Sequence, residues 1–156
     1  MDSKAVISFC HIYRCLRAGV ASGDKDQSVK INVEHCLITN SGTLGGIFTN
    51  GELVAFNCLI NKNTSINKPG GITARMTVVT GCEIADNDGS GIVILEKGKF
   101  KVTDCLIRNN RKFGVVMGEN ATAEFYNNTF RENGQGHWSI DDTATVIRRG
   151  NRPSDE

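Results

Sequence analysis

The sequence predicts an all-β fold, a right-handed parallel β-helix (solenoid) of about six coils. Three observations predict it. A short motif returns about every 23 residues along almost the whole chain. Each copy reads as short β-rich segments divided by Gly, Asn and Asp, without the three-to-four spacing of apolar residues that is typical of helices. The period is also too short for repeats of helical pairs, which need roughly 33 to 47 residues.

The motif has six copies, which define the domain organisation. In chain order they are CHIYRC at 10–15, CLITNS at 36–41, CLINKN at 58–63, CEIADN at 82–87, CLIRNN at 105–110 and NTFREN at 128–133. We therefore predict one repeat domain over residues 1–147, followed by a polar tail over 148–156. Its coils are expected near 5–29, 30–54, 55–78, 79–100, 101–123 and 124–147.

The first motif position is a column of cysteines: Cys10, Cys36, Cys58, Cys82 and Cys105. A large apolar residue follows two positions later in every copy, so both side chains are expected to point inward from one strand. Cysteine then acts as a small apolar filler that stacks on itself. Even spacing without a secretion signal favours buried, reduced thiols over disulfides.

The sixth motif position is a column of asparagines, Asn63, Asn87, Asn110 and Asn133, with Cys15 and Ser41 in the first two copies. Asparagine tolerates a left-handed backbone at a corner, and its amide bonds to the backbone and to the asparagines above and below. We therefore predict a structural ladder of stacked amides at one corner of the coil. A glycine before a β-branched residue marks the next corner in five copies.

Two partly apolar stripes are expected on the outside of the coils. One comprises Leu37, Leu59 and Leu106, and the other comprises Phe48, Val93 and Val116. Apolar stripes on an exposed face are typical of a binding surface for a partner. The alternative is that a missing segment, or the loops around 22–28 and 64–70, covers them, and the sequence leaves both open.

Composition and charge exclude several classes of function. Eighteen basic and 17 acidic residues leave a net charge of +1, which argues against nucleic acid as a partner. No apolar run is long enough for membrane insertion, and the first residues make a poor secretory signal, so a cytoplasmic protein is expected. We predict no cofactor and no metal, because CHIYRC lacks a second pair of ligands.

Parallel β-helices often act on polysaccharides, so the acidic residues need testing for catalysis. Glycoside hydrolysis requires two carboxylates that face one sugar. The most enzyme-like cluster is His137 with Asp141 and Asp142, but it lies in the last, diverged coil, where capping is the simpler role. Trp138 is expected to plug that coil. We therefore predict no catalytic residues, and keep His137, Asp141 and Asp142 as an alternative glycan site.

The repeat pattern Cys-x-Ile-x-x-Asn-x-x-x-Gly-[Ile/Val] resembles the parallel β-helix repeats of carbohydrate-binding proteins and sugar hydrolases. Residues 112–147 are most similar to the C-terminal β-helix of the Shc SH2-domain-binding protein family, and the β-helices of F-box proteins come second. The polygalacturonase signature is absent: Asp141-Asp142 follow His137, and the remaining parts of that signature are missing. The first coil has no evident N-terminal cap, so we expect the C-terminal portion of a larger protein or a truncated gene product.

The resemblance implies a non-enzymatic adaptor or scaffold linked to cell division or signalling. Its expected partner is a signalling adaptor or a component of the spindle or midbody, bound by the outward apolar stripes on one face. The expected location is the cytoplasm, with the cytoskeleton, spindle or midbody as specific sites. The alternative is a β-helix that binds or modifies carbohydrate, as a lyase, epimerase or hydrolase would.

Overall fold

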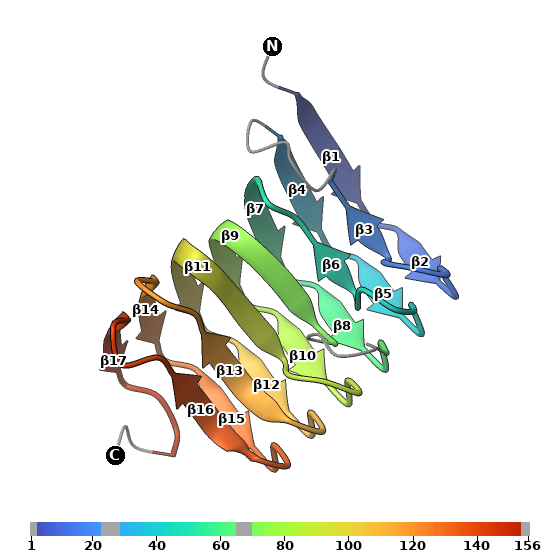
Figure 1. The fold of residues 1–156 in the computed structure, drawn as a ribbon. Coiled ribbons are helices and arrows are strands. Elements are labelled where there is room, and N and C mark those ends of the chain that lie inside the picture. Colours follow the sequence, from blue (N-terminus) through green and yellow to red (C-terminus); the bar gives the residue numbers. More distant parts are fainter. Residues whose placement is uncertain (1–2, 23–28, 65–69, 154–156) are drawn as a thin grey trace.

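The computed structural model describes residues 3–22, 29–64 and 70–153. The described chain contains strands and no helix, and every strand pairs in parallel with the equivalent strand of a neighbouring coil (Figure 1). The coils stack in chain order, so the two termini lie at opposite ends of the solenoid (Figure 1). The predicted all-β parallel solenoid of about six turns, with a period of about 23 residues, is confirmed.

Each coil contributes to three faces, because the chain turns three times per repeat. The first face comprises β1(Lys4–Ser8), β4(Lys30–Glu34), β7(Glu52–Phe56), the second halves of β9(Ile72–Thr80) and β11(Ile92–Thr103), β14(Thr122–Tyr126) and β17(Thr145–Arg149). The second face comprises β2(His11–Tyr13), β5(Leu37–Thr39), β8(Leu59–Asn61), β10(Glu83–Ala85), β12(Leu106–Arg108) and β15(Thr129–Arg131). The third face comprises β3(Val20–Ala21), β6(Ile47–Phe48), the first halves of β9(Ile72–Thr80) and β11(Ile92–Thr103), β13(Phe113–Met117) and β16(Gly136–Ile140).

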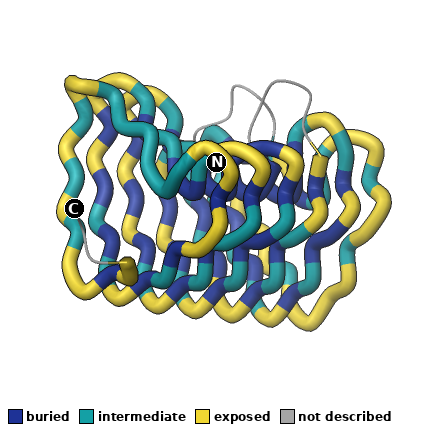
Figure 2. The backbone as a smooth tube through the Cα atoms, turned by 90° about the horizontal axis from the view of Figure 1, so that it is seen from below, coloured by how far each residue is buried: buried dark blue, intermediate teal, exposed yellow. Residues whose placement is uncertain are grey.

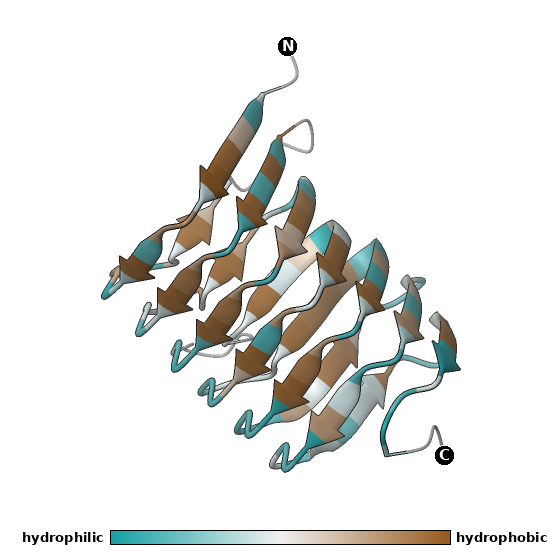
Figure 3. Ribbon diagram, turned by 180° about the vertical axis from the view of Figure 1, so that it is seen from behind, coloured by the Kyte–Doolittle hydropathy of each residue, from teal (hydrophilic) through white to brown (hydrophobic). Residues whose placement is uncertain are grey.

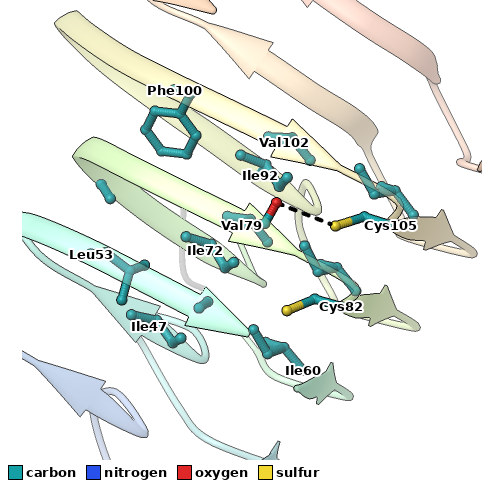
Figure 4. Close-up of a cluster of buried hydrophobic side chains, with 14 of the residues drawn as sticks. Ile47, Leu53, Ile60, Ile72, Val79, Cys82, Ile92, Phe100, Val102 and Cys105 are labelled. Atoms are coloured by element: carbon teal, nitrogen blue, oxygen red, sulfur yellow. Dashed lines mark hydrogen bonds between the residues drawn. The ribbon is translucent and has the colours of Figure 1, made fainter. Parts of the chain in front are cut away.

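The core is a set of columns in which like side chains stack in register between coils. On the second face the inward column pairs Ile38 with Ile60, Ile60 with Ile84, and Ile84 with Ile107, all without exposed surface. Inward residues of the other two faces meet this column inside the coil (Figure 4). Figure 2 shows the resulting rows of buried positions along the stack. Each such isoleucine stabilises the fold by about 2 kcal/mol.

The cysteine column lies inside the coil as predicted, except at its first member. Cys36, Cys58, Cys82 and Cys105 are buried free thiols, whereas Cys10, in the first coil, is exposed. The thiols of Cys36, Cys58 and Cys105 donate to backbone carbonyls of the preceding coil, and Cys105 Sγ lies 3.7 Å from the Val79 oxygen (Figure 4). The Cys82 thiol donates to the Thr80 carbonyl. They therefore fill space and satisfy backbone acceptors.

The asparagine ladder is present with the expected bonds. Asn87 Nδ2 donates to Asn110 Oδ1 at 2.9 Å and to the Ile60 carbonyl at 3.2 Å, and Asn87 Oδ1 accepts from Asn63 Nδ2 at 3.1 Å. The ladder asparagines are at most 8% exposed. Each amide thus satisfies buried polar groups of two neighbouring coils, which would otherwise lose their hydrogen bonds to water.

The left-handed corner residues are not the ladder asparagines themselves, contrary to the sequence-based expectation. Positive φ angles instead occur one residue earlier, at Asn40, Lys62, Asp86 and Asn109, between 52° and 54°. The preceding residue makes the sharp turn because the ladder amide has to point into the coil to reach its partners. The residues before the cysteine column behave in the same way: Phe9, His35, Asn57, Gly81, Asp104, Asn127 and Gly150.

The glycine column permits close stacking of the third face, as predicted. A Cβ added at Gly71 would lie 2.1 Å from the Gly91 carbonyl oxygen of the next coil. No side chain fits at that distance, so only glycine lets these corners approach.

Residues 148–152, expected to be a polar tail, instead continue the stack. The boundary placed at 147 falls within β17, which pairs with β14. Asn151 is 4% exposed, and its Oδ1 accepts from Asn128 Nδ2 at 3.0 Å. Asn128 and Asn151 therefore extend the cysteine column as an amide ladder. The step of 23 residues from Cys105 through both positions carried this signal.

Trp138 plugs the last coil, as expected. It occupies the inward position of β16 next to Val115 in the register. Its ring centroid lies 4.8 Å from that of Phe125 and 4.5 Å from that of Phe130, and the Arg148 guanidinium lies 5.2 Å above it. An aromatic ring and a cation thus cover the end of the core.

Candidate functional site

A groove of about 940 Å³ runs along the outside of the third face. Its floor is the outward column of that face, which holds Phe48, Thr73, Val93, Val116 and Ser139 in register. Three of these, Phe48, Val93 and Val116, form the second stripe predicted from the sequence. The structure thus brings this stripe together as the floor of one continuous hollow.

The walls of the groove come from the corners at either side of the third face. One wall contains Arg17, Leu44, Ser90, Lys112, Phe113 and Gln135, and the other contains Asn50, Arg75, Leu95 and Glu96. In the first wall the Leu44 N–H donates to the Arg17 carbonyl at 2.8 Å. In the same way the Gln135 N–H donates to the Lys112 carbonyl at 3.0 Å, so residues of successive coils are hydrogen-bonded along this wall. The groove therefore combines an apolar floor with polar and cationic walls.

Two polar atoms in this groove lack hydrogen-bond partners within the described chain. Thr73 is only 2% exposed although it points outward between the inward residues Ile72 and Ala74, and its Oγ1 is unsatisfied. Arg75, two residues further along β9, has a buried Nε without a partner. Successive odd positions of a strand share one face, so both groups project to the groove side. Native proteins rarely leave buried donors without partners.

The charge of the groove is positive. Arg17, Arg75 and Lys112 line it, and none of them takes part in an ion pair found among the described residues. The carboxylate that lines it, Glu96, lies 3.0 Å from Lys97 Nζ. The cations are therefore not neutralised by neighbouring side chains, which favours an anionic ligand.

The first predicted stripe lies elsewhere. Leu37, Leu59 and Leu106 project from the second face and are half-buried, so the two stripes do not share one face. Glu83 stands between Leu59 and Leu106 in the register, where its Oε1 accepts from Arg108 Nη2 at 2.6 Å. This ion pair divides the apolar stripe. Figure 3, drawn from behind, shows polar segments interrupting the hydrophobic strands.

The residues proposed as an alternative glycan site are held apart by local structure. His137 lies in β16 and Asp141 follows it, about 13 Å further along an extended chain. Asn133 accepts from Asn110 in the ladder, and this bond orients the Asn133 amide. Asn133 Nδ2 then donates to His137 Nδ1 at 3.3 Å, so His137 is the last hydrogen-bonding partner of the ladder. Asp141 Oδ1 accepts from the Thr143 hydroxyl at 2.6 Å, which lowers the pKa of Asp141. Asp142 is exposed beside it.

The loops that were expected to cover the stripes fall mainly on residues 23–28 and 65–69, which lie outside the described residues. In the part of the chain that is described, no group of three or more His, Cys, Asp or Glu side chains is arranged to hold a metal ion. The same residues form no helix that could span a membrane.

Comparison with known families agrees with this geometry. The family model described as a right handed beta helix region matches residues 1–152. The chain belongs to this family. The β-helix is therefore right-handed, as predicted. No curated protein and no solved structure matches the chain significantly, so the relationship is at the level of the family and its fold.

Sequence reasoning missed the polar part of this β-helix groove. Thr73 was recognisable as a hydroxyl within an otherwise largely apolar outward column. Arg75 and Lys112 carried no such signal, because they lie at corners whose equivalent positions in other coils hold unrelated residues, such as Leu95 and Leu44. Only the stacking of the coils shows that these corners form two walls over one floor.

Proposed function

We propose that this β-helix is a non-catalytic protein-interaction module that binds an extended segment of a partner in the groove of the third face. The groove itself carries the proposal: a hollow of about 940 Å³ with Phe48, Val93 and Val116 along its floor. Clefts with an apolar lining and a few placed polar groups are typical binding sites. Lateral binding along a solenoid is also the common use of repeat proteins.

The charge distribution supports binding rather than hydrolysis. Glycosidases need two carboxylates on opposite sides of one bond. Among the described residues that line the groove, Glu96 is the one carboxylate, and Lys97 already pairs with it. We therefore propose that the groove recognises its ligand without transforming it.

The biological setting that we propose rests on the resemblance of residues 112–147 to the Shc SH2-domain-binding protein family. It is a cytoplasmic adaptor or scaffold in cell division or signalling, with a spindle, midbody or signalling-adaptor protein as partner. Nucleic acid and membrane insertion have no part in this proposal.

Carbohydrate binding is the second candidate. Phe113, Gln135 and Ser139 lie together along one part of the groove, and sugars are bound by such combinations of an aromatic ring with polar side chains. A glycan would then occupy the same groove, whereas His137, Asp141 and Asp142 would mark a separate site at the end of the last coil.

The test is a pulldown from dividing cells with the purified chain, run beside a glycan array. The groove variant Val93→Glu/Val116→Glu is compared with Val54→Glu/Val78→Glu, a matched pair that points outward from the first face. We expect capture of a spindle, midbody or Shc-type adaptor protein that the groove variant loses and the matched variant keeps. Equal capture by both folded variants would contradict the groove as the site. Glycan binding without protein capture would favour the second candidate.

A further inference from the structure

We infer that the Thr73–Arg75 pair is a carboxylate-recognition subsite, so that the groove selects acidic peptide segments. This inference rests on the proposed function, because it names the chemical class of the segment that the groove would bind. It adds that the charge of the ligand, and not only its apolar surface, determines binding.

The first argument is the pair of unsatisfied groups. Thr73 Oγ1 and Arg75 Nε are both buried, both on the groove side of β9, and both without partners in the described chain. A hydroxyl and a guanidinium N–H are both donors, so one acceptor group can satisfy the two together. An ionised carboxylate has two acceptor oxygens and makes stronger bonds to arginine than a neutral carbonyl does.

The second argument is the surrounding charge. Arg17 and Lys112 stand on the opposite wall, so cations flank the floor on both sides. Glu96 is held by Lys97 and does not balance them. A ligand of several acidic residues is therefore complementary to the groove along its length, whereas a basic or neutral segment leaves these cations without partners.

The third argument is the apolar floor between the cations. Phe48 and Leu95 lie beside the Thr73–Arg75 pair, and Val93 and Val116 continue the floor toward Ser139. A segment in which acidic residues alternate with aliphatic ones can place aliphatic side chains on the floor and carboxylates toward the walls. An anionic polysaccharide shares the carboxylates but presents no aliphatic side chains to this floor.

The experiment uses fluorescein-labelled peptides that alternate glutamate with leucine, and matched peptides that alternate glutamine with leucine. Binding to the purified chain is measured by fluorescence polarisation, with oligogalacturonate as the carbohydrate probe. We expect the acidic peptide to bind about tenfold more tightly than the amide peptide, as one charge-assisted contact implies. Arg75→Gln should abolish this preference. Arg131→Gln, which removes an exposed arginine from the second face, should keep it.

Thr73→Val provides a variant of nearly the same shape. It should weaken binding of the acidic peptide severalfold and leave the amide peptide unchanged, which a purely structural role of Thr73 would not do. Equal binding of both peptides to the wild-type chain would overturn the carboxylate subsite. If Val93→Glu/Val116→Glu then abolished both, the proposed protein-binding groove would still stand.

Three further outcomes would contradict the inference, and the first of them would also contradict the proposed function. Arg75-dependent binding of oligogalacturonate without peptide binding would replace the peptide by an acidic glycan, and would contradict the proposed function as well. Absence of binding by all three probes would overturn the inference. Retention of the acidic preference by a folded Arg75→Gln variant would do so too.

Discussion

Asn110 Oδ1 accepts hydrogen bonds from both Asn87 Nδ2, at 2.9 Å, and the Asn87 backbone nitrogen, at 3.3 Å. Its own Nδ2 donates to Asn133 Oδ1 at 3.0 Å and to the Ile84 carbonyl at 3.1 Å. One side chain thus satisfies polar groups of the coils on both sides. Each ladder asparagine therefore hydrogen-bonds to both neighbouring coils, and removal of one such side chain leaves several buried polar groups without partners.

Substitution of Asn110 by alanine should lower the free energy of unfolding by about 3 kcal/mol, because buried donors of Asn87 lose their acceptor. Urea denaturation followed by circular dichroism measures the change. Asn32→Ala is the matched control, since Asn32 projects outward from β4 and its Oδ1 has no partner among the described residues. A similar decrease in the free energy of unfolding for both variants would contradict a stabilising role of the ladder hydrogen bonds.

The buried thiols of Cys36 and Cys82 should react slowly in the native protein. Burial raises the pKa of Cys36. The Cys82 thiol donates a hydrogen bond to the Cys105 sulfur, which chiefly raises the pKa of Cys82, to about 12, and lowers that of Cys105. Less thiolate of Cys36 and Cys82 is then present at a given pH, and access is poor as well. Alkylation by iodoacetamide, mapped by mass spectrometry, should label Cys10 and Cys15 first. Labelling of Cys82 as fast as Cys10 would contradict the buried column.

The raised pKa of Cys82 makes stability fall at high pH. The unfolded chain loses the Cys82 proton near the ordinary pKa of 9.0, whereas the folded chain keeps it until about pH 12. The unfolded state therefore binds fewer protons between these values, and Cys82 lowers stability by up to about 1.4 kcal/mol per pH unit as the pH rises. Urea titrations of the wild type and of Cys82→Ala across this range should show a shallower slope for the variant. Equal slopes would exclude Cys82 as the cause.

Thr73→Val should stabilise the free protein by about 1 kcal/mol, because it removes a buried hydroxyl that has no partner and keeps the side-chain shape. The melting temperature, measured by differential scanning calorimetry, should rise. Thr77→Val is the comparison, since Thr77 is 4% exposed, also has an unsatisfied Oγ1, and points inward rather than into the groove. Both should gain stability, and only Thr73→Val should lose ligand. Lower stability of Thr73→Val would indicate a partner for its hydroxyl.

Trp138→Ala should destabilise the C-terminal end of the stack by about 3 kcal/mol, because it uncovers Phe125 and Phe130. Hydrogen exchange should show faster opening of β14 and β16 than of β4 and β7. Trp138→Phe, which keeps an apolar ring, should lose less. Uniformly faster exchange along the whole chain would contradict a local capping role.

Much of this fold could be predicted from the spacing of the repeated cysteine, isoleucine and asparagine residues alone. A strand has a side-chain period of two, so a cysteine followed two residues later by isoleucine has to present both to the same side. Repetition of that pair every 23 or so residues then leaves stacked coils as the arrangement that buries both. The asparagine column follows from the same logic, because a polar side chain repeated at one buried position needs copies of itself as partners.

The tertiary structure determined which residues line the groove. Arg17, Arg75 and Lys112 come from three different coils, and their positions follow no repeat in the sequence. They meet in one groove because the third face lies between two corners, and β9 and β11 bend there to carry their residues from the third face to the first. The sequence therefore determined which residues point in and which point out, since local alternation sets this. Only the packing of coil on coil determined which outward residues share a surface, since those neighbours are distant in the chain.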